Sequence, residues 1–285
     1  MRQRKLKGLE EKLSVYAENS SVCTGRMKGR WNELFDSRQP LFAELGCGKG
    51  QFILSRAEAR PDRNFIAVEG NDSVMLRALQ KAARRLLPLS EESAVSPDGN
   101  ERPFEELVPE GVFQAERIPE DAVPEGICEG GAREAAGAGK RRGSGKGRIF
   151  RAAPNLVFVN MYIRDIKECF SENELSGIYL NFSDPWPKDR HAKRRLTHAG
   201  YLAGYRHVLM PDSPLEFKTD NKELFLFSME EFRKSGWGIE EYSEDLHRSN
   251  CESKRFQTEY EEKFSSLGKP IYYCRARSAD VFPAR

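Results

Sequence analysis

The 285 residues of this chain suffice for one large domain or two small ones. Lysine and arginine total 46 against 44 aspartates and glutamates, which leaves a formal net charge of only +2. The total charge therefore does not indicate a nucleic-acid-binding protein, and only the placement of the charges could do so.

The six cysteines favour neither a disulfide framework nor a zinc site. None of them forms a C-x-x-C pair, and no histidine cluster accompanies them. The N-terminal stretch MRQRKLKGLEEKL lacks the apolar core of a signal peptide, and no run is long and apolar enough to span a membrane. We therefore expect a cytoplasmic protein without a metal ion and without a membrane partner.

Apolar runs alternate with helical patterns after a polar, basic N-terminal extension that we place at residues 1–40. The predicted strands are 41–45, 65–69, 155–160, 177–182, 214–219 and 271–277. The predicted helices are 51–60, 72–87, 165–170, 197–209 (capped by Thr197) and 221–236. This alternation is typical of an α/β domain, here 41–285, with a mostly parallel central sheet and helices on both faces. Ligands of such sheets bind at the carboxyl ends of the strands.

Residues 88–152 interrupt this alternation. They are rich in Pro, Gly, Glu and Ala, with an acidic first part and a basic last part. Such a composition cannot bury enough apolar surface to offset chain entropy, so we predict a mostly disordered insertion. Its basic residues Lys140, Arg141, Arg142 and Lys146 could bind nucleic acid, although a solvated linker is the simpler interpretation.

A glycine-rich loop, ELGCGKGQ at 44–51, follows the first strand. A phosphate-binding Walker loop would need Ser or Thr after Lys49, and a dinucleotide loop would need its third glycine one position later. A loop for S-adenosylmethionine fits better, because that ligand carries an amine and a sulfonium and tolerates a nearby carboxylate. The candidate cofactor-binding residues of this loop are Glu44, Gly46, Gly48 and Gly50.

Two further strand ends offer contacts to a nucleoside. Glu69 ends the second strand, where a carboxylate can accept both ribose hydroxyls in nicotinamide and methyl-donor sites alike. After the third strand, Asn160 could hydrogen-bond an adenine. Tyr162 could stack on the same ring or could simply pack at the edge of the sheet.

The fourth strand leads into NFSDPWPKDRHAKRRL at 181–196. Pro185 and Pro187 stiffen the turn, so that Asp184 and Trp186 project over the cofactor end of the sheet. A planar substrate with donors on one edge would suit this pair, and guanine offers N1–H and an exocyclic amine there. A turn whose tryptophan packs into the core is the alternative.

Five cations follow that turn directly, with His191 among them. Beside a base pocket they would grip the phosphates that flank the base, and a free purine would need no such patch. The substrate is therefore expected to be a polymer, unless the run is only a solvated basic face. The cations are Lys188, Arg190, Lys193, Arg194 and Arg195.

Taken together, these motifs resemble those of the bacterial tRNA (guanine-N7-)-methyltransferase family. The matching stretches are MKGRWNELF, AELGCGKGQF, FIAVE, YLNFSDPWPKDRHAKRRL, FKTDN and TEYEEKFSSLGKPIY. The resemblance implies a Rossmann-like S-adenosylmethionine-dependent methyltransferase fold. It also implies methylation of N7 of the variable-loop guanine, position 46 of tRNA, with S-adenosylmethionine as donor and tRNA as partner.

The resemblance further implies roles for individual residues. Glu44 and Glu69 match cofactor-binding positions, and Asp184 matches the active-site aspartate, which also touches the cofactor. The positions that match substrate-binding residues are Lys188, Asp220, Thr258, Glu259, Tyr260 and Glu261. The sequence departs from the family pattern at Tyr162, where many members have an acidic residue, and in the 88–152 insertion.

Three other functions stay open from the sequence alone. The turn also resembles the D/N-P-P-aromatic signature of methyltransferases that act on exocyclic amines of nucleic-acid bases. A non-catalytic RNA-binding protein with a vestigial cofactor site, or a nicotinamide oxidoreductase, would fit fewer of the motifs. We expect a monomer or a homodimer.

Overall fold

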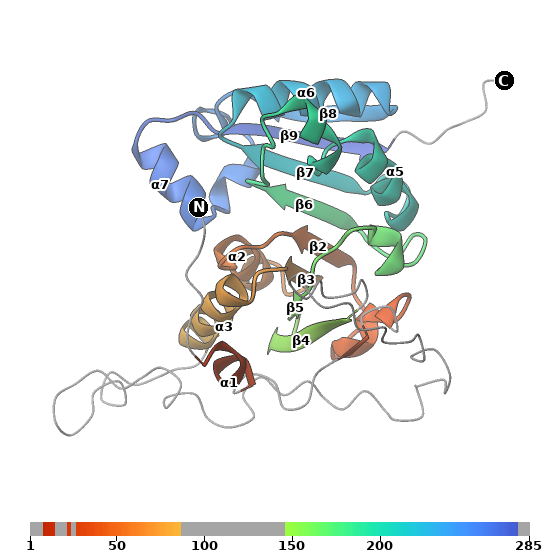
Figure 1. Cartoon of the computed structure of the whole chain (residues 1–285), viewed down its shortest axis with the longest axis vertical. Helices are drawn as coiled ribbons and strands as arrows, with labels where there is room; N and C mark the ends of the chain where they lie inside the picture. Colours follow the sequence, from red (N-terminus) through yellow and green to blue (C-terminus); the bar gives the residue numbers. More distant parts are fainter. Residues whose placement is uncertain (1–7, 15–21, 24–26, 87–145, 279–285) are drawn as a thin grey trace, which may run out of the picture.

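The computed structural model describes residues 8–14, 22–23, 27–86 and 146–278. Within these residues one sheet has the strand order β1-β4-β5-β3-β2-β6-β7-β9-β8 (Figure 1). The strands are β1 (Val22–Cys23), β2 (Leu41–Leu45), β3 (Asn64–Glu69), β4 (Lys146–Ala153), β5 (Leu156–Asn160), β6 (Gly177–Asn181), β7 (Pro214–Thr219), β8 (Trp237–Ser243) and β9 (Tyr272–Ser278). The α-helices are α1 (Leu9–Ser14), α2 (Gln51–Ala59), α3 (Asp72–Leu86), α5 (Ala199–Val208), α6 (Lys222–Lys234) and α7 (Glu259–Ser266).

The centre of the sheet is parallel. Strands β5, β3, β2, β6 and β7 run in one direction, while β4 at one side and β9 at the other pair antiparallel. Strand β9 lies between β7 and the edge strand β8. The carboxyl ends of the parallel strands therefore meet at one edge of the sheet, which confirms the mostly parallel α/β architecture predicted above.

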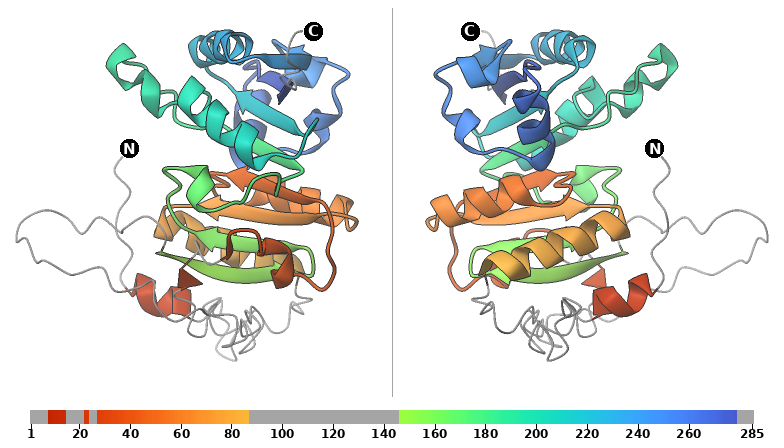
Figure 2. Two further views of the ribbon diagram at one scale, coloured as in Figure 1. Left: turned by 90° about the vertical axis from the view of Figure 1, so that its right-hand side faces the viewer. Right: turned by 90° about the vertical axis from the view of Figure 1, so that its left-hand side faces the viewer.

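Separate hydrophobic cores lie on the two faces of the sheet. In β2, Ala43 and Leu45 face the core that contains α5 and α6, whereas Phe42 faces the core that contains α2 and α3. The two opposite views of Figure 2 show α5 in front of the sheet in one and α2 with α3 in front of it in the other. Helices on both faces are therefore confirmed.

The six predicted strands are confirmed to within one residue at either end. The predicted helices are present as α2, α3, α5, α6 and the short 3-10 turn η5 (Ile166–Glu168). One cap was wrong: α5 begins after His198, whose Nδ1 accepts a hydrogen bond from the Gly200 N–H. Thr197 is instead buried, with its hydroxyl 2.7 Å from that of Ser228.

The boundaries of the two irregular segments differ from the prediction. The last residues of the predicted insertion form β4, because Ile149 and Phe150 are buried against β5 and α3. Residues 88–145, including Lys140, lie outside the described part. Within the predicted extension, Trp31 is 1% exposed and donates its Nε1–H to the carbonyl of Cys169, so the core begins before residue 41.

Strand β8 was missed altogether. Its residues alternate between more and less buried positions, as an edge strand with one covered face does. Two adjacent glutamates, Glu240 and Glu241, hide this alternation in the sequence.

Candidate active site

The glycine loop forms a tight turn between β2 and α2. Gly46, Gly48 and Gly50 all have positive φ angles, of 81°, 59° and 78°, which glycine adopts without strain. The Gly46 N–H donates to the carbonyl of Val68 at 2.8 Å, which fixes the turn to the end of β3. A side chain at Gly46 or Gly48 would meet no atom of the described residues within 4 Å, whereas one at Gly50 would approach the Phe158 ring to 3.0 Å. The first two glycines thus leave open space for a ligand, and the third permits packing.

Glu69 ends β3 beside this turn. One carboxylate oxygen accepts the Gly48 N–H at 3.1 Å, and the other accepts the Asn71 N–H at 2.7 Å. Burial raises the pKa of Glu69, and these backbone donors oppose that rise. The carboxylate is therefore held rigidly at the point where the sequence predicts a ribose contact.

A pocket of about 340 Å³ opens where the ends of the parallel strands meet. This volume lies within the range of small-molecule sites. Its walls bring together predicted cofactor-binding and substrate-binding residues, namely Gly46, Glu69, Tyr162, Asp184, Trp186 and Arg194.

Glu44 lies on β2 and is fully buried. The Asn181 Nδ2–H donates to its Oε1 at 2.8 Å, while its Oε2 has no hydrogen-bond partner among the described residues. Burial raises the pKa of Glu44 to about 8, against smaller opposing effects of Asn181 and Lys218. A cationic group brought near this carboxyl would favour its charged form.

The two residues predicted to contact an adenine differ in placement. Asn160 is 1% exposed, and its Nδ2–H donates to the carbonyl of Glu69 at 3.0 Å. It therefore holds the end of β3 and is not on the pocket wall. Tyr162 is 65% exposed on that wall, and a side chain at Gly70 would come within 2.3 Å of its ring. Glycine at that position allows the tyrosine to lie close against the backbone.

The Asp-Pro-Trp-Pro turn has an unusual backbone. Phe182 and Trp186 have positive φ angles of 52° and 41°, which non-glycine residues seldom adopt. Arg195 stabilises the turn, since it donates to the carbonyl oxygens of Pro185 and Trp186, each at 3.1 Å. Arg195, predicted among the phosphate-binding cations, is thus committed to the turn itself.

Trp186 is half-buried on the pocket wall and is not part of the core. The guanidinium of Arg194 lies 4.8 Å from its ring centroid, and His191 meets the ring edge-on at 5.7 Å. The other cations of the run, Lys188, Arg190 and Lys193, are exposed. An aromatic surface and a basic surface are therefore adjacent at the mouth of the pocket.

Helix α7 lies at the same edge of the molecule. Tyr260 is 44% exposed; its hydroxyl donates to Asp220 Oδ2 at 3.2 Å, and its ring lies 5.1 Å from that of Phe182. Thr258 caps the helix by accepting the Glu261 N–H at 3.0 Å. Of the four predicted substrate residues here, Tyr260 is the one turned outward.

The remaining two predicted substrate residues, Glu259 and Glu261, are acidic and pair with other side chains of the protein. Glu259 pairs with Lys81 of α3. Glu261 is fully buried, with its carboxylate 3.2 Å from Lys218 Nζ and 3.1 Å from His247 Nε2. In this structure Glu261 offers no surface to a substrate, which departs from the contact that the resemblance implied.

Comparison with known proteins agrees with this geometry. A family model described as "Putative methyltransferase" matches residues 38–93 and 147–274. The chain is 35% identical over 279 residues to the tRNA (guanine-N(7)-)-methyltransferase of Brevibacillus brevis, covering 97% of this chain and 98% of that one. It is also 35% identical over 274 residues to the enzyme of the same name from Lachnoclostridium phytofermentans, covering 95% and 96%. The chain belongs to the tRNA (guanine-N7-)-methyltransferase family.

Among solved structures, the 16S rRNA methyltransferase KamB matches with a TM-score of 0.49 and 10% identity over 91% of this chain and all of that one.

The strand order of the sheet and the family membership identify the described fold as the Rossmann-like methyltransferase fold. Its donor, S-adenosylmethionine, carries an ammonium and a sulfonium. Among the described residues, Glu44 Oε2 has no partner and the space above Gly46 and Gly48 is open, and both features fit such a ligand.

Three residues that shape the site of this tRNA (guanine-N7-)-methyltransferase family member were not predicted from the sequence, and a fourth, Arg195, was predicted to bind phosphate. The three are Gly70 under Tyr162, Asn181 on Glu44 and Lys218 under α7, whereas Arg195 holds the turn. Only Lys218 gave a signal in the sequence. It lies within the predicted strand 214–219, and a buried ammonium there requires partners.

In the described part of this family member, no group of three or more His, Cys, Asp or Glu side chains is arranged to hold a metal ion. Cys47, Cys169, Cys251 and Cys274 are free thiols there. None of the helices described could cross a bilayer, since none combines sufficient length with sufficient apolar character.

Glu44→Gln is expected to change the pH dependence of folding stability. The folded chain keeps a proton on Glu44 up to about pH 8, whereas the unfolded chain releases it near 4.5. The free energy of unfolding therefore falls as the pH rises through this window, by an amount on the order of a few kcal/mol. A glutamine at this position cannot titrate and can still accept from Asn181, so urea unfolding between pH 5 and 8.5 should show a flatter profile.

The matched control is Glu172→Gln, which removes an exposed carboxylate. We expect its profile to follow that of the wild type. If Glu44→Gln also follows the wild type over this range, Glu44 is charged in the folded protein and the assignment of a neutral carboxyl is wrong.

Proposed function

We propose that this chain transfers a methyl group from S-adenosylmethionine to N7 of the variable-loop guanine of tRNA, position 46. The observation that carries the proposal is one pocket whose walls include Gly46 and Glu69 as well as Asp184 and Trp186. Donor and base would meet in this cavity. The printed names of the relatives favour guanine N7 over the alternative, an exocyclic amine of a nucleic-acid base.

S-adenosylmethionine supplies an electrophilic methyl group on its sulfonium. The backbone of Gly46 and Gly48 would lie against it, and the carboxylate of Glu69 would accept its ribose hydroxyls. Glu44 would face its cationic end, and the exposed ring of Tyr162 would stack on the adenine. Asn160, held inward by its bond to Glu69, would support these contacts indirectly.

The guanine would stack on Trp186 and present its N1–H and amine to Asp184. N7 carries an in-plane lone pair, so no proton has to be removed before it attacks. Alignment of the two reactants then supplies most of the rate enhancement. Because the purine becomes cationic as the bond forms, the carboxylate of Asp184 stabilises the developing charge.

The exposed cations beside Trp186 would bind the tRNA backbone. Lys188 and Arg190 project from the end of the turn, and Arg194 can contact a phosphate while it stacks on Trp186. Asp220 and Tyr260 would form the opposite side of the substrate entrance, with Thr258 and Glu259 fixing α7 beneath them.

Lys188→Ala is expected to weaken tRNA binding and to flatten its salt dependence. Removal of one phosphate-binding cation should reduce the slope of log affinity against log salt by roughly 0.7–0.9. Filter binding between low and moderate salt measures that slope. Lys234→Ala is the control, because Lys234 pairs with Glu230 at the far end of α6. Equal slopes for Lys188→Ala and the wild type would remove Lys188 from the tRNA interface.

The proposed reaction is tested by incubating the protein with labelled S-adenosylmethionine and unmodified tRNA. Label in the tRNA, followed by chain cleavage at 7-methylguanosine, is the expected result. Nuclease digestion and mass analysis separate this product from a methylated amine, which would support the alternative. Absence of any transfer to tRNA would contradict the proposal.

We further propose that the enzyme works in the cytoplasm as a monomer or homodimer. Residues 41–285 would form one methyltransferase domain, to which 27–40 contribute core side chains such as Trp31. The segment 88–145 would be an insertion in this domain.

A further inference from the structure

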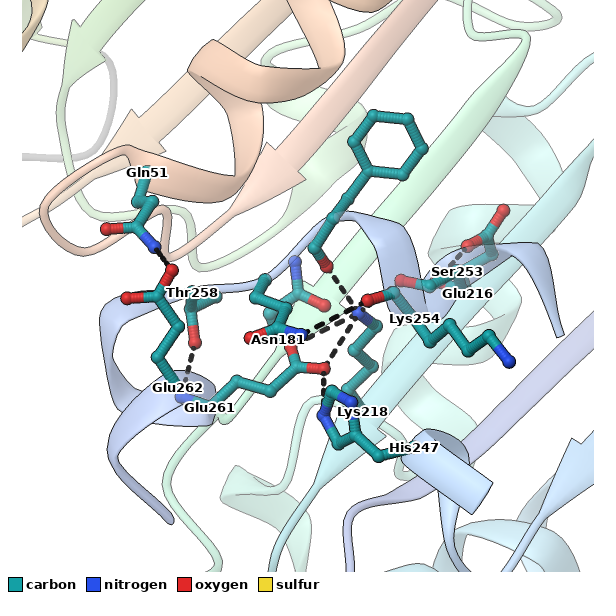
Figure 3. Close-up of polar contacts among 12 residues, drawn as sticks. Gln51, Asn181, Glu216, Lys218, His247, Ser253, Lys254, Thr258, Glu261 and Glu262 are labelled. Atoms are coloured by element: carbon teal, nitrogen blue, oxygen red, sulfur yellow. Dashed lines mark hydrogen bonds and ion pairs between the residues drawn. The ribbon is translucent and has the colours of Figure 1, made fainter. Parts of the chain in front are cut away.

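Lys218 is a buried cation that the proposed mechanism does not use. It is the penultimate residue of β7, and its side chain is 1% exposed. Its Nζ donates to the carbonyl oxygens of Ser253 at 2.8 Å and Phe256 at 2.7 Å, and to the Glu261 carboxylate at 3.2 Å (Figure 3). An ammonium has three donors, so a single segment, 253–261, takes all of them.

The partner carboxylate is equally enclosed. Glu261 is fully buried, and burial raises its pKa while burial lowers the pKa of Lys218. Apolar side chains of similar volume often replace such a pair without loss of stability. Stability alone therefore gives no reason for an ion pair here, whereas directional bonds from one ammonium to three acceptors fix a position.

The segment held by Lys218 reaches the pocket entrance. Tyr260 precedes Glu261, its ring lies 5.1 Å from Phe182 on the pocket wall, and its hydroxyl bonds Asp220. Asp220 itself follows Lys218 by two residues. One side chain thus sets the relative position of the strand end and the helix that form this side of the entrance.

The same helix also contacts the cofactor side. Gln51, the first residue of α2 after the glycine turn, donates to Glu262, as Figure 3 shows. Lys81 of α3 pairs with Glu259. Helix α7 therefore spans from the glycine turn to Asp220, and its own Glu261 points inward to Lys218 beneath it.

We infer that Lys218 and Glu261 are a positioning pair that holds α7 so that Tyr260 and Asp220 form the tRNA-facing rim of the pocket. The inference rests on the proposed function, since it takes tRNA as the substrate. It gives Glu261 a role through Lys218 in place of a direct contact with the substrate.

The decisive variant is Lys218→Met/Glu261→Met, which removes both charges together and leaves neither partner buried alone. We expect KM for tRNA to rise about tenfold or more, with the affinity for S-adenosylmethionine within about twofold of the wild type. The conservative variant Glu261→Gln keeps an acceptor for Lys218 and should recover most of the tRNA affinity. Steady-state kinetics, tRNA binding and cofactor titration give the three readouts.

The control is Thr197→Val/Ser228→Ala, which removes a buried polar contact in another part of the structure, between the start of α5 and α6. It should lower stability without changing KM for tRNA, so that loss of a buried polar pair alone does not explain the effect.

Two results would overturn the inference. One is a double methionine variant with wild-type KM for tRNA; the other is a variant that loses cofactor affinity in parallel or fails to fold, because the pair would then support the whole domain. Binding of tRNA is measured apart from methyl transfer. A wild-type protein that binds tRNA without methylating it would contradict the proposed function. The tRNA affinities of the wild type and the double methionine variant could still be compared.

Discussion

Asp184→Ala should bind S-adenosylmethionine nearly as the wild type does, yet lose methyl transfer to tRNA by a factor on the order of 10²–10³. Asp184 is exposed on the pocket wall, so its removal should change folding stability little. The loss falls on kcat because the carboxylate acts on charge that appears only as N7 becomes alkylated. Single-turnover transfer of labelled methyl, beside a cofactor titration, measures both effects.

Two further variants sharpen the Asp184 result. Asp184→Asn keeps a hydrogen-bond acceptor for the base edge but removes the negative charge. Its activity should lie between those of Asp184→Ala and the wild type. The gain over Asp184→Ala measures orientation of the base, and the remaining loss measures the effect of the charge. Asp189→Ala removes an exposed carboxylate from η6 (Asp189–Arg194), outside the pocket wall, and should stay active. Near-full turnover by Asp184→Ala would show that the alignment of donor and base needs no carboxylate there.

The meeting of Gly46, Glu69 and Asp184 in one pocket was predictable from the sequence. Each residue follows or ends a run typical of a buried strand, and the carboxyl ends of neighbouring parallel strands meet at one edge. The strand order of the sheet then brings them together without any knowledge of side-chain contacts. This is why the pocket agrees with the prediction although β4 and β8 were missed.

The direction in which a side chain points was not predictable in the same way. Asn160 and Tyr162 lie two residues apart at the end of the same strand, yet the first is buried on the Glu69 carbonyl and the second is exposed. Glu261 turns inward because Lys218, distant in sequence, lies beneath α7. Such choices depend on pairings between elements, and the local pattern of residues does not encode them.

The neutral character of Glu44 also follows from surroundings that the sequence does not show. From the sequence, a carboxylate next to the glycine turn is expected to be negatively charged and to bind a cationic group. In the structure, burial dominates over the hydrogen bond from Asn181 and the charge of Lys218, and raises the pKa of Glu44 to about 8. Glu69, in contrast, accepts hydrogen bonds from the backbone N–H groups of Gly48 and Asn71.

Glu69→Ala should therefore cause the largest loss of cofactor affinity. Two charge-assisted hydrogen bonds to the ribose would disappear, worth about 3–5 kcal/mol together, or roughly two to four orders of magnitude in Kd. The variant also frees the N–H groups of Gly48 and Asn71, so local disorder must be separated from the loss of the ribose bonds. Asn71→Ala serves as the control, because it removes the acceptor of the Ser73 and Val74 N–H groups and spares the carboxylate. Calorimetric titration that gives Asn71→Ala and Glu69→Ala the same weakened Kd would assign the whole effect to the turn.

The pH dependence of binding provides a second measurement of the same carboxylate. Burial raises the pKa of Glu69 above its ordinary value of 4.5, so protonation begins at a higher pH than for an exposed glutamate. The protonated form accepts one hydroxyl less well, and cofactor affinity should fall as the pH drops through that raised pKa. Glu69→Gln, which cannot titrate, should bind weakly and with little change over the acidic range. An acidic decline that persists unchanged in Glu69→Gln would place the responsible proton on another group and remove Glu69 from the ribose contact.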